Sequence, residues 1–60
     1  MIITVDAAAE IPPYAQVRSQ ILDAIATGAL PPGTRLPTIR QLAGDLGLAN
    51  NTVARAYREL

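Results

Sequence analysis

Two short patterns of helical periodicity, separated by Gly47, restrict the fold of this 60-residue chain more than any other feature. On each side of the glycine, apolar residues recur at positions i, i+3, i+4 and i+7, the spacing of one face of an α-helix. Because glycine readily adopts a positive φ angle, the patterns predict two short helices joined by a tight turn. The apolar positions are Ile39, Leu42, Ala43 and Leu46 before the glycine, and Val53, Ala56, Tyr57 and Leu60 after it.

Capping residues mark where these two helices begin. Thr38 and Gln41 have the spacing of a capping box, in which each side chain bonds to the other residue's backbone N–H, so Gln41 is expected to be structural. The second helix is expected to begin at Asn50 or Asn51, with Asn50 as its N-cap. No glycine, proline or basic last turn closes this helix before Leu60, so we expect the natural protein to continue beyond it.

An earlier helix is predicted from residue 13, because proline suits a first helical turn. Gly28 is expected to end it, and the Pro-Pro-Gly run at residues 31–33 is expected to break the chain. Before this helix, residues 1–12 are predicted to form a short N-terminal strand at residues 2–5, followed by a connector. The apolar stripe expected to be buried on the helix is Tyr14, Val17, Ile21, Leu22 and Ile25.

The composition excludes several classes of protein. The chain has no cysteine and no histidine, and all five of its basic residues are arginines. Disulfides, thiolate nucleophiles, Schiff bases and the usual zinc ligands are therefore absent, and the acidic residues form no pair at catalytic spacing. We expect no enzyme and no cofactor. The first residues resemble neither a signal peptide nor a membrane span, so we expect a cytoplasmic protein without a membrane partner.

The charges are unevenly distributed, although the net charge is zero. The first 32 residues carry Arg18 as their only base, together with three acidic residues, whereas residues 33–60 carry four arginines against Asp45 and Glu59. The basic residues therefore accumulate where the helix pair is predicted, which favours a polyanionic partner.

Burying the apolar stripe of the last helix turns its polar side outward. Asparagine can bond bidentately to adenine, and arginine to guanine or phosphate. Helix-turn-helix proteins insert their second helix into the major groove of DNA. A recognition helix at about residues 50–60 is therefore predicted to contact double-stranded DNA. Its outward residues are Asn50, Asn51, Thr52, Ala54, Arg55 and Arg58.

Several ordered motifs resemble the N-terminal winged-helix domain of the GntR family of regulators. They are residues 32–37 (PGTRLP), 40–43 (RQLA), 46–48 (LGL) and 51–60 (NTVARAYREL). Residues 2–6 (IITVD) and 13–17 (PYAQV) resemble the YtrA subgroup of that family. We therefore expect a mainly α fold: the three-helix helix-turn-helix core of a winged-helix domain over residues 13–60, with the wing hairpin missing.

The resemblance implies a sequence-specific transcription regulator, expected to be a repressor, that binds operator DNA as a homodimer. Dimerisation and a small-molecule effector are expected to use regions beyond residue 60. By position, Arg40 would contact a backbone phosphate, residues 50–52 would lie at the operator, and Arg55 would face the duplex. Many members carry arginine at the positions of Asn50 and Ala54; their absence here favours adenine reading by asparagine or contacts dominated by phosphate.

Two alternatives remain open at the level of sequence. The chain could be the front domain of a MocR-type regulator, in which a pyridoxal-phosphate-binding, aminotransferase-like domain follows; that chemistry would need residues outside this chain. It could instead be a helical protein-interaction module without DNA binding, which the zero net charge favours. Salt-sensitive binding to a DNA duplex would distinguish this last alternative from the others.

Overall fold

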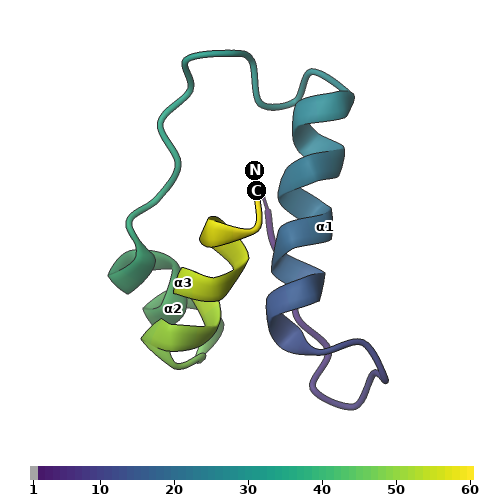
Figure 1. Ribbon diagram of the computed structural model, residues 1–60, viewed down its shortest axis with the longest axis vertical. Coiled ribbons are helices and arrows are strands. Elements are labelled where there is room, and N and C mark those ends of the chain that lie inside the picture. Colours follow the sequence, from purple (N-terminus) through teal and green to yellow (C-terminus); the bar gives the residue numbers. More distant parts are fainter. Residues whose placement is uncertain (1) are drawn as a thin grey trace.

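The computed structural model describes residues 2–60; Met1, the first residue of the predicted N-terminal segment, lies outside them. Three helices follow one another: α1 (Pro13–Ala26), α2 (Ile39–Leu46) and α3 (Asn50–Arg58). Figure 1 shows α1 along one side and α2 and α3 together on the other, with the teal segment at residues 27–38 looping between them. The predicted mainly α fold with a helix-turn-helix core is confirmed.

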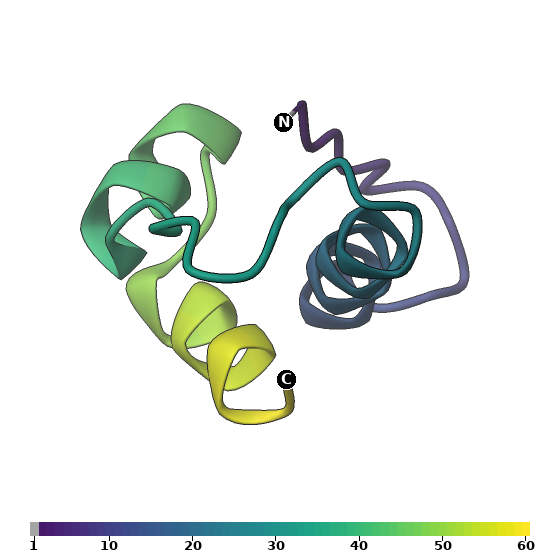
Figure 2. The same cartoon turned by 90° about the horizontal axis from the view of Figure 1, so that it is seen from above.

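Helix α3 occupies the centre of the packing. It packs against both α1 and α2, whereas the backbones of α1 and α2 do not approach each other (Figure 2). The fully buried side chains Val17 and Ile21 of α1 lie in the same core as Val53 of α3. Alanines are buried at Ala43 and Ala56, where a small side chain lets two helices approach closely. The orientation of α3 therefore depends on both of its neighbours.

The start and end of α1 agree with the turn chemistry of the sequence. The Pro12 carbonyl accepts hydrogen bonds from the backbone N–H groups of Ala15 and Gln16. At the other end, Gly28 has a φ of 82°, and the Leu30 N–H donates to a carbonyl in the last turn at 2.9 Å. Glycine adopts this left-handed conformation without the clash that a Cβ would cause.

The predicted apolar stripe of α1 is wrong at two positions. Leu22 and Ile25 are 45% and 52% exposed, whereas Val17 and Ile21 are fully buried. Of the two other helices, only α3 packs against α1, so a narrow stripe is enough to fill that contact. The wider stripe that the sequence suggested is therefore only partly used.

The N-terminal strand expected at residues 2–5 is not formed: the structure assigns no strand within residues 2–60. The segment is held by side chains of α1 instead. The side-chain amide of Gln20 accepts from the Thr4 N–H at 3.0 Å and donates to the Thr4 carbonyl at 2.6 Å. Gln16 makes the same pair of bonds with Asp6, at 2.8 and 2.9 Å. Two glutamines thus satisfy backbone groups that a neighbouring strand would otherwise bond.

Candidate nucleic-acid interface

The start of α2 carries the capping box that the sequence predicts. The Gln41 N–H donates to Thr38 Oγ1 at 3.1 Å, and the Thr38 N–H donates to Gln41 Oε1 at 3.1 Å. Two backbone donors that an α-helix cannot satisfy internally are thereby bonded. Gln41 serves as a cap, as predicted, and the first turn of α2 is fixed by residues adjacent in sequence.

Gly47 makes the turn between α2 and α3. Its φ is 68°, and the backbone N–H groups of Gly47 and Leu48 both donate to the Ala43 carbonyl. A single left-handed residue therefore ends α2 and redirects the chain, and α3 begins only three residues later. This short connection holds α2 and α3 in a helix-turn-helix.

Helix α3 begins at Asn50, one of the two predicted positions, but its N-cap differs from the prediction. Ala49, not Asn50, is the N-cap residue, and no side chain makes a capping hydrogen bond there. Asn50 is the first residue of the helix, and its side chain is exposed. An alanine methyl group cannot accept a hydrogen bond, so the sequence gives no local signal for a cap at this position.

The outward side of α3 is polar and open to solvent. Asn50, Asn51 and Arg58 are exposed, and Thr52 is half-buried. With about 100° of rotation per residue, Asn51 and Arg58 lie opposite the core-facing positions of α3. Ala54 lies between Asn51 and Arg58 along the helix; its side chain is half-buried and has no polar group.

Arg55 lies on the flank of α3 that faces α1. Its guanidinium carbon lies 3.8 Å from the centre of the Tyr14 ring, and its Nη2 donates to the Tyr14 hydroxyl at 3.1 Å. Its Nε donates to Glu59 Oε2 at 3.2 Å, one helical turn further along α3. The side chain nevertheless remains 54% exposed. Arg55, the arginine predicted to face DNA, thus contacts α1 through Tyr14 and still reaches solvent.

Glu59 connects two arginines from two helices. Its Oε1 bonds to Arg18 of α1, and its Oε2 bonds to Arg55 of α3. The hydrogen bond from Arg55, followed by the hydrogen bond and charge of Arg18, holds the pKa of the Glu59 carboxyl below its ordinary value. The carboxylate therefore stays ionised at neutral pH and balances part of the positive charge at this edge of the domain.

The remaining predicted cations make no such contacts. Arg40 lies in the first turn of α2 and Arg58 in the last turn of α3, and both are exposed. Within residues 2–60, neither side chain makes a hydrogen bond or an ion pair. The predicted site residues therefore occupy two helices: Arg40 on α2, and Asn50, Asn51, Thr52, Arg55 and Arg58 on α3.

Comparison with known proteins identifies the domain. The model of the bacterial regulatory proteins of the gntR family matches residues 13–60. The chain belongs to the GntR family. It carries the helix-turn-helix of a GntR-family regulatory protein, as the motifs of the sequence predicted.

Relatives of this GntR-family chain support the same assignment. An HTH-type transcriptional regulator of Mycobacterium tuberculosis is 64% identical over 93% of the chain, which covers 46% of that protein. The HTH-type transcriptional repressor YtrA of Bacillus subtilis is 36% identical over 97% of the chain, which covers 45% of it. The solved structure of YtrA from Sulfolobus acidocaldarius, a GntR-family transcription factor, matches the whole chain with a TM-score of 0.93 and 45% identity; the chain covers 64% of it. The chain thus spans about half the length of these two curated relatives.

Sequence reasoning missed three residues that surround Arg55 in this GntR-family domain: Tyr14, Arg18 and Glu59. The spacing of Arg55 and Glu59, four residues apart, was the available signal for their pairing. No local signal connects Tyr14 to Arg55, since 41 residues separate them. Tyr14 was expected on the buried stripe of its helix; its ring is half-buried and also stacks against the Arg55 guanidinium.

The second tyrosine connects α3 to the chain before α2. The Tyr57 hydroxyl donates to the Pro37 carbonyl at 2.6 Å in a half-buried position. Burial raises the pKa of this hydroxyl above its usual value. The bond joins the end of α3 to the segment before α2, so it helps to hold α3 at a fixed angle.

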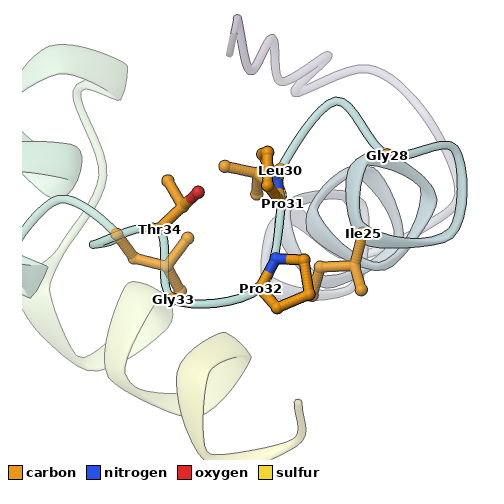
Figure 3. A pocket seen from close by; sticks show the side chains of 8 residues that line it. Ile25, Gly28, Leu30, Pro31, Pro32, Gly33 and Thr34 are labelled. Carbon is orange, nitrogen blue, oxygen red and sulfur yellow. The ribbon is translucent and has the colours of Figure 1, made fainter.

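A pocket of the GntR-family domain is lined by residues of α1 and the following segment and by none of α3. It encloses about 330 Å³ between the end of α1 and the segment at residues 30–36 (Figure 3). Its walls carry no charged side chain; they are Ile25, Gly28, Leu30, Pro31, Pro32, Gly33, Thr34 and Leu36. Across residues 2–60, no group of acidic, histidine or cysteine side chains could hold a metal ion, and no helix could span a membrane.

Proposed function

We propose that this chain is the DNA-binding domain of a transcription regulator that reads a specific duplex sequence with α3 in the major groove. The observation that carries this proposal is the exposed polar side of α3, presented by a helix-turn-helix whose turn is fixed at Gly47. A helix in this position enters the major groove, with its N-terminal residues towards the bases.

The side chains divide into base-reading and phosphate-binding groups. Asn51, together with Asn50, is suited to bond the edge of adenine, and Thr52 adds a hydroxyl beside them. Arg40, in the first turn of α2, and Arg58, in the last turn of α3, are both exposed and are suited to bind backbone phosphates. Arg55 adds a positive charge on the flank of α3 that faces α1. Neither of the two outward positions at Asn50 and Ala54 carries an arginine, so we expect preference for adenine rather than for guanine.

The names of two relatives support repression as the mode of action. The histidine utilization repressor of Pseudomonas aeruginosa, 43% identical over 82% of the chain, and YtrA of Bacillus subtilis are both named as repressors. We therefore propose repression as the mode of action, with residues 13–60 as the DNA-binding domain. We also propose a cytoplasmic homodimer on a palindromic operator, with any effector bound outside this chain.

A second candidate is favoured by one further relative. A probable rhizopine catabolism regulatory protein, MocR, of Rhizobium meliloti is 36% identical over 97% of the chain, which covers only 12% of that protein. The same helix-turn-helix could therefore stand in front of a much larger domain. The protein sequence that follows Leu60 decides between the two candidates.

The proposal is tested by selecting DNA from a random duplex library with the full-length protein. We expect one enriched sequence. The affinity for it should fall as salt is added, and the plot of log K against log salt should have a slope of about −0.9 for each phosphate contacted. Asn51→Ala should weaken binding by about 1–3 kcal/mol and relax the preference at an adenine position. Arg55→Ala should weaken binding across sequences and lower the salt slope by about one.

Matched controls are available among exposed residues outside the helix-turn-helix. Ser19→Ala on α1 controls for the loss of a small polar side chain, and Arg35→Ala in the loop before α2 controls for the loss of a charge. Both should leave the enriched sequence and its affinity unchanged. If Asn51→Ala and Arg55→Ala bind as the unmodified protein does, α3 is not the recognition helix.

A further inference from the structure

Arg55 is the one arginine on the exposed sides of α2 and α3 whose side chain is already held in place. Arg40 and Arg58 make no hydrogen bond or ion pair within residues 2–60, so each must be ordered when it meets DNA. Arg55, by contrast, has a ring against its face, a bond at Nε and a bond at Nη2. A long side chain that is ordered before binding loses less conformational entropy on binding.

The ring that holds Arg55 belongs to the rigid part of the domain. Tyr14 lies in the first turn of α1, half-buried, and packs against the core. Helices α3 and α1 lie next to each other (Figure 2), and the Arg55 side chain reaches from α3 to Tyr14 on α1. The stack therefore fixes the guanidinium relative to α1 as well as to α3, and it does so at the edge of the outward side of α3.

The contacts of Arg55 leave part of its guanidinium available. A guanidinium carries five N–H donors, of which the Nε donor faces Glu59 and one Nη2 donor faces Tyr14. The remaining donors have no partner within residues 2–60, and the side chain is 54% exposed. A planar donor edge of this kind matches the oxygens of a phosphate.

We propose that Tyr14, on α1, is a positioning residue for DNA binding. Its ring holds the Arg55 guanidinium so that the open donor edge of the guanidinium is directed at a phosphate of the DNA backbone. A phosphate is the expected ligand because Arg55 lies on the flank of α3 that faces α1, whereas Asn51 lies directly opposite the core. This inference rests on the proposed function and extends it to a residue outside the helix-turn-helix.

The test is a double-mutant cycle on the full-length protein, with the duplex enriched in the selection above as the probe. Tyr14→Leu should weaken binding by about two- to ten-fold, the range expected when one long side chain must be ordered on binding. The same change made together with Arg55→Ala should have no further effect. Made together with Arg58→Ala, it should keep its full effect, because Arg58 does not touch Tyr14.

Conservative replacement separates positioning from a purely structural role. Tyr14→Phe keeps the ring under the guanidinium and should restore most of the affinity lost in Tyr14→Leu. The salt slope of Tyr14→Leu should fall towards that of Arg55→Ala, whereas loss of folded protein alone would lower the active fraction and leave the slope unchanged. An equal loss from Tyr14→Leu with and without Arg55 would overturn the proposal.

A measurement on the unmodified protein keeps the inference testable if Tyr14→Leu does not fold. A tyrosine ring 3.8 Å from a guanidinium shifts the NMR signals of the arginine side chain upfield. We expect this shift for Arg55 and not for Arg58, and we expect it to persist in the DNA complex. Loss of the shift on binding would refute positioning. Absence of any DNA binding by the unmodified protein would instead refute the proposed function, and this inference with it.

Discussion

Arg18, Arg55 and Glu59 show how two like charges from different helices can be held near each other. One carboxylate receives both arginines, each on its own oxygen. The shared acid offsets the repulsion between the cations and joins α1 to the end of α3. Exposed ion pairs of this kind contribute little free energy on their own, so their main effect is on the position of the side chains.

The lowered pKa of Glu59 gives a test of this contact. A carboxyl with a folded-state pKa below its unfolded value stabilises the fold above the unfolded value, and this contribution disappears as the pH falls through the folded-state pKa. Glu59→Gln should therefore be less stable than the unmodified protein at neutral pH. The difference should shrink on acidification below the ordinary value of 4.5.

Thermal unfolding between neutral and acid pH measures this difference. Glu10→Gln is the matched control, because the exposed Glu10 side chain makes no hydrogen bond or ion pair within residues 2–60. It should follow the unmodified protein at every pH. A constant difference for Glu59→Gln across the acid range would show that the pair with the arginines is not responsible.

The element that most determines the geometry of the interface is the turn between α2 and α3. Its shape comes from one left-handed residue, Gly47, and from the double hydrogen bond to the Ala43 carbonyl. Gly44 lies within α2 and has an ordinary helical conformation. A Cβ added at either glycine would meet no atom within 4 Å, so the two positions differ in backbone conformation and not in available space.

Substitution of these two glycines should therefore have opposite effects. Gly47→Ala forces a Cβ into the left-handed region and should destabilise the domain by about 1–2 kcal/mol. Gly44→Ala replaces glycine in a helix interior and should stabilise the domain by about 0.5–1 kcal/mol. Urea unfolding monitored by circular dichroism measures both. Equal effects of the same sign would contradict the role assigned to the turn.

At the scale of the whole molecule, stability is concentrated in a few side chains. A folded chain of 60 residues has a total stability of roughly 3–9 kcal/mol. The fully buried side chains of largest volume are Ile21, Val17 and Val53, at the contact between α1 and α3. Helix α3 therefore keeps its orientation through a small core, and a single cavity there affects the whole domain.

Neighbouring residues on α1 test this concentration. Ile21→Ala should destabilise the domain by about 2–5 kcal/mol, because its side chain is fully buried. Leu22→Ala should change stability by about 0.5 kcal/mol or less, because Leu22 is 45% exposed. Denaturant unfolding measures the stability of both variants. A large loss is expected for Ile21→Ala and not for Leu22→Ala. Comparable losses would mean that the exposed side of α1 is covered in the natural protein.

Periodicity and turn chemistry alone predicted the helix pair, the capping box at Thr38 and the left-handed turn at Gly47. Each of these depends on residues within a few positions of one another, so periodicity and turn chemistry are sufficient. The same local reasoning identified the outward side of α3, because the buried stripe of a helix fixes the direction of the opposite side.

Contacts between distant parts of the chain could not be predicted from local patterns. The stack of Tyr14 on Arg55 and the binding of residues 4 and 6 by two glutamines join segments that no local pattern connects. The exposure of Leu22 and Ile25 was also decided by the tertiary structure, since α1 needs no wider apolar stripe than α3 covers. Such contacts depend on how the helices pack in three dimensions, and the spacing of residues along one helix carries no record of what lies across from it.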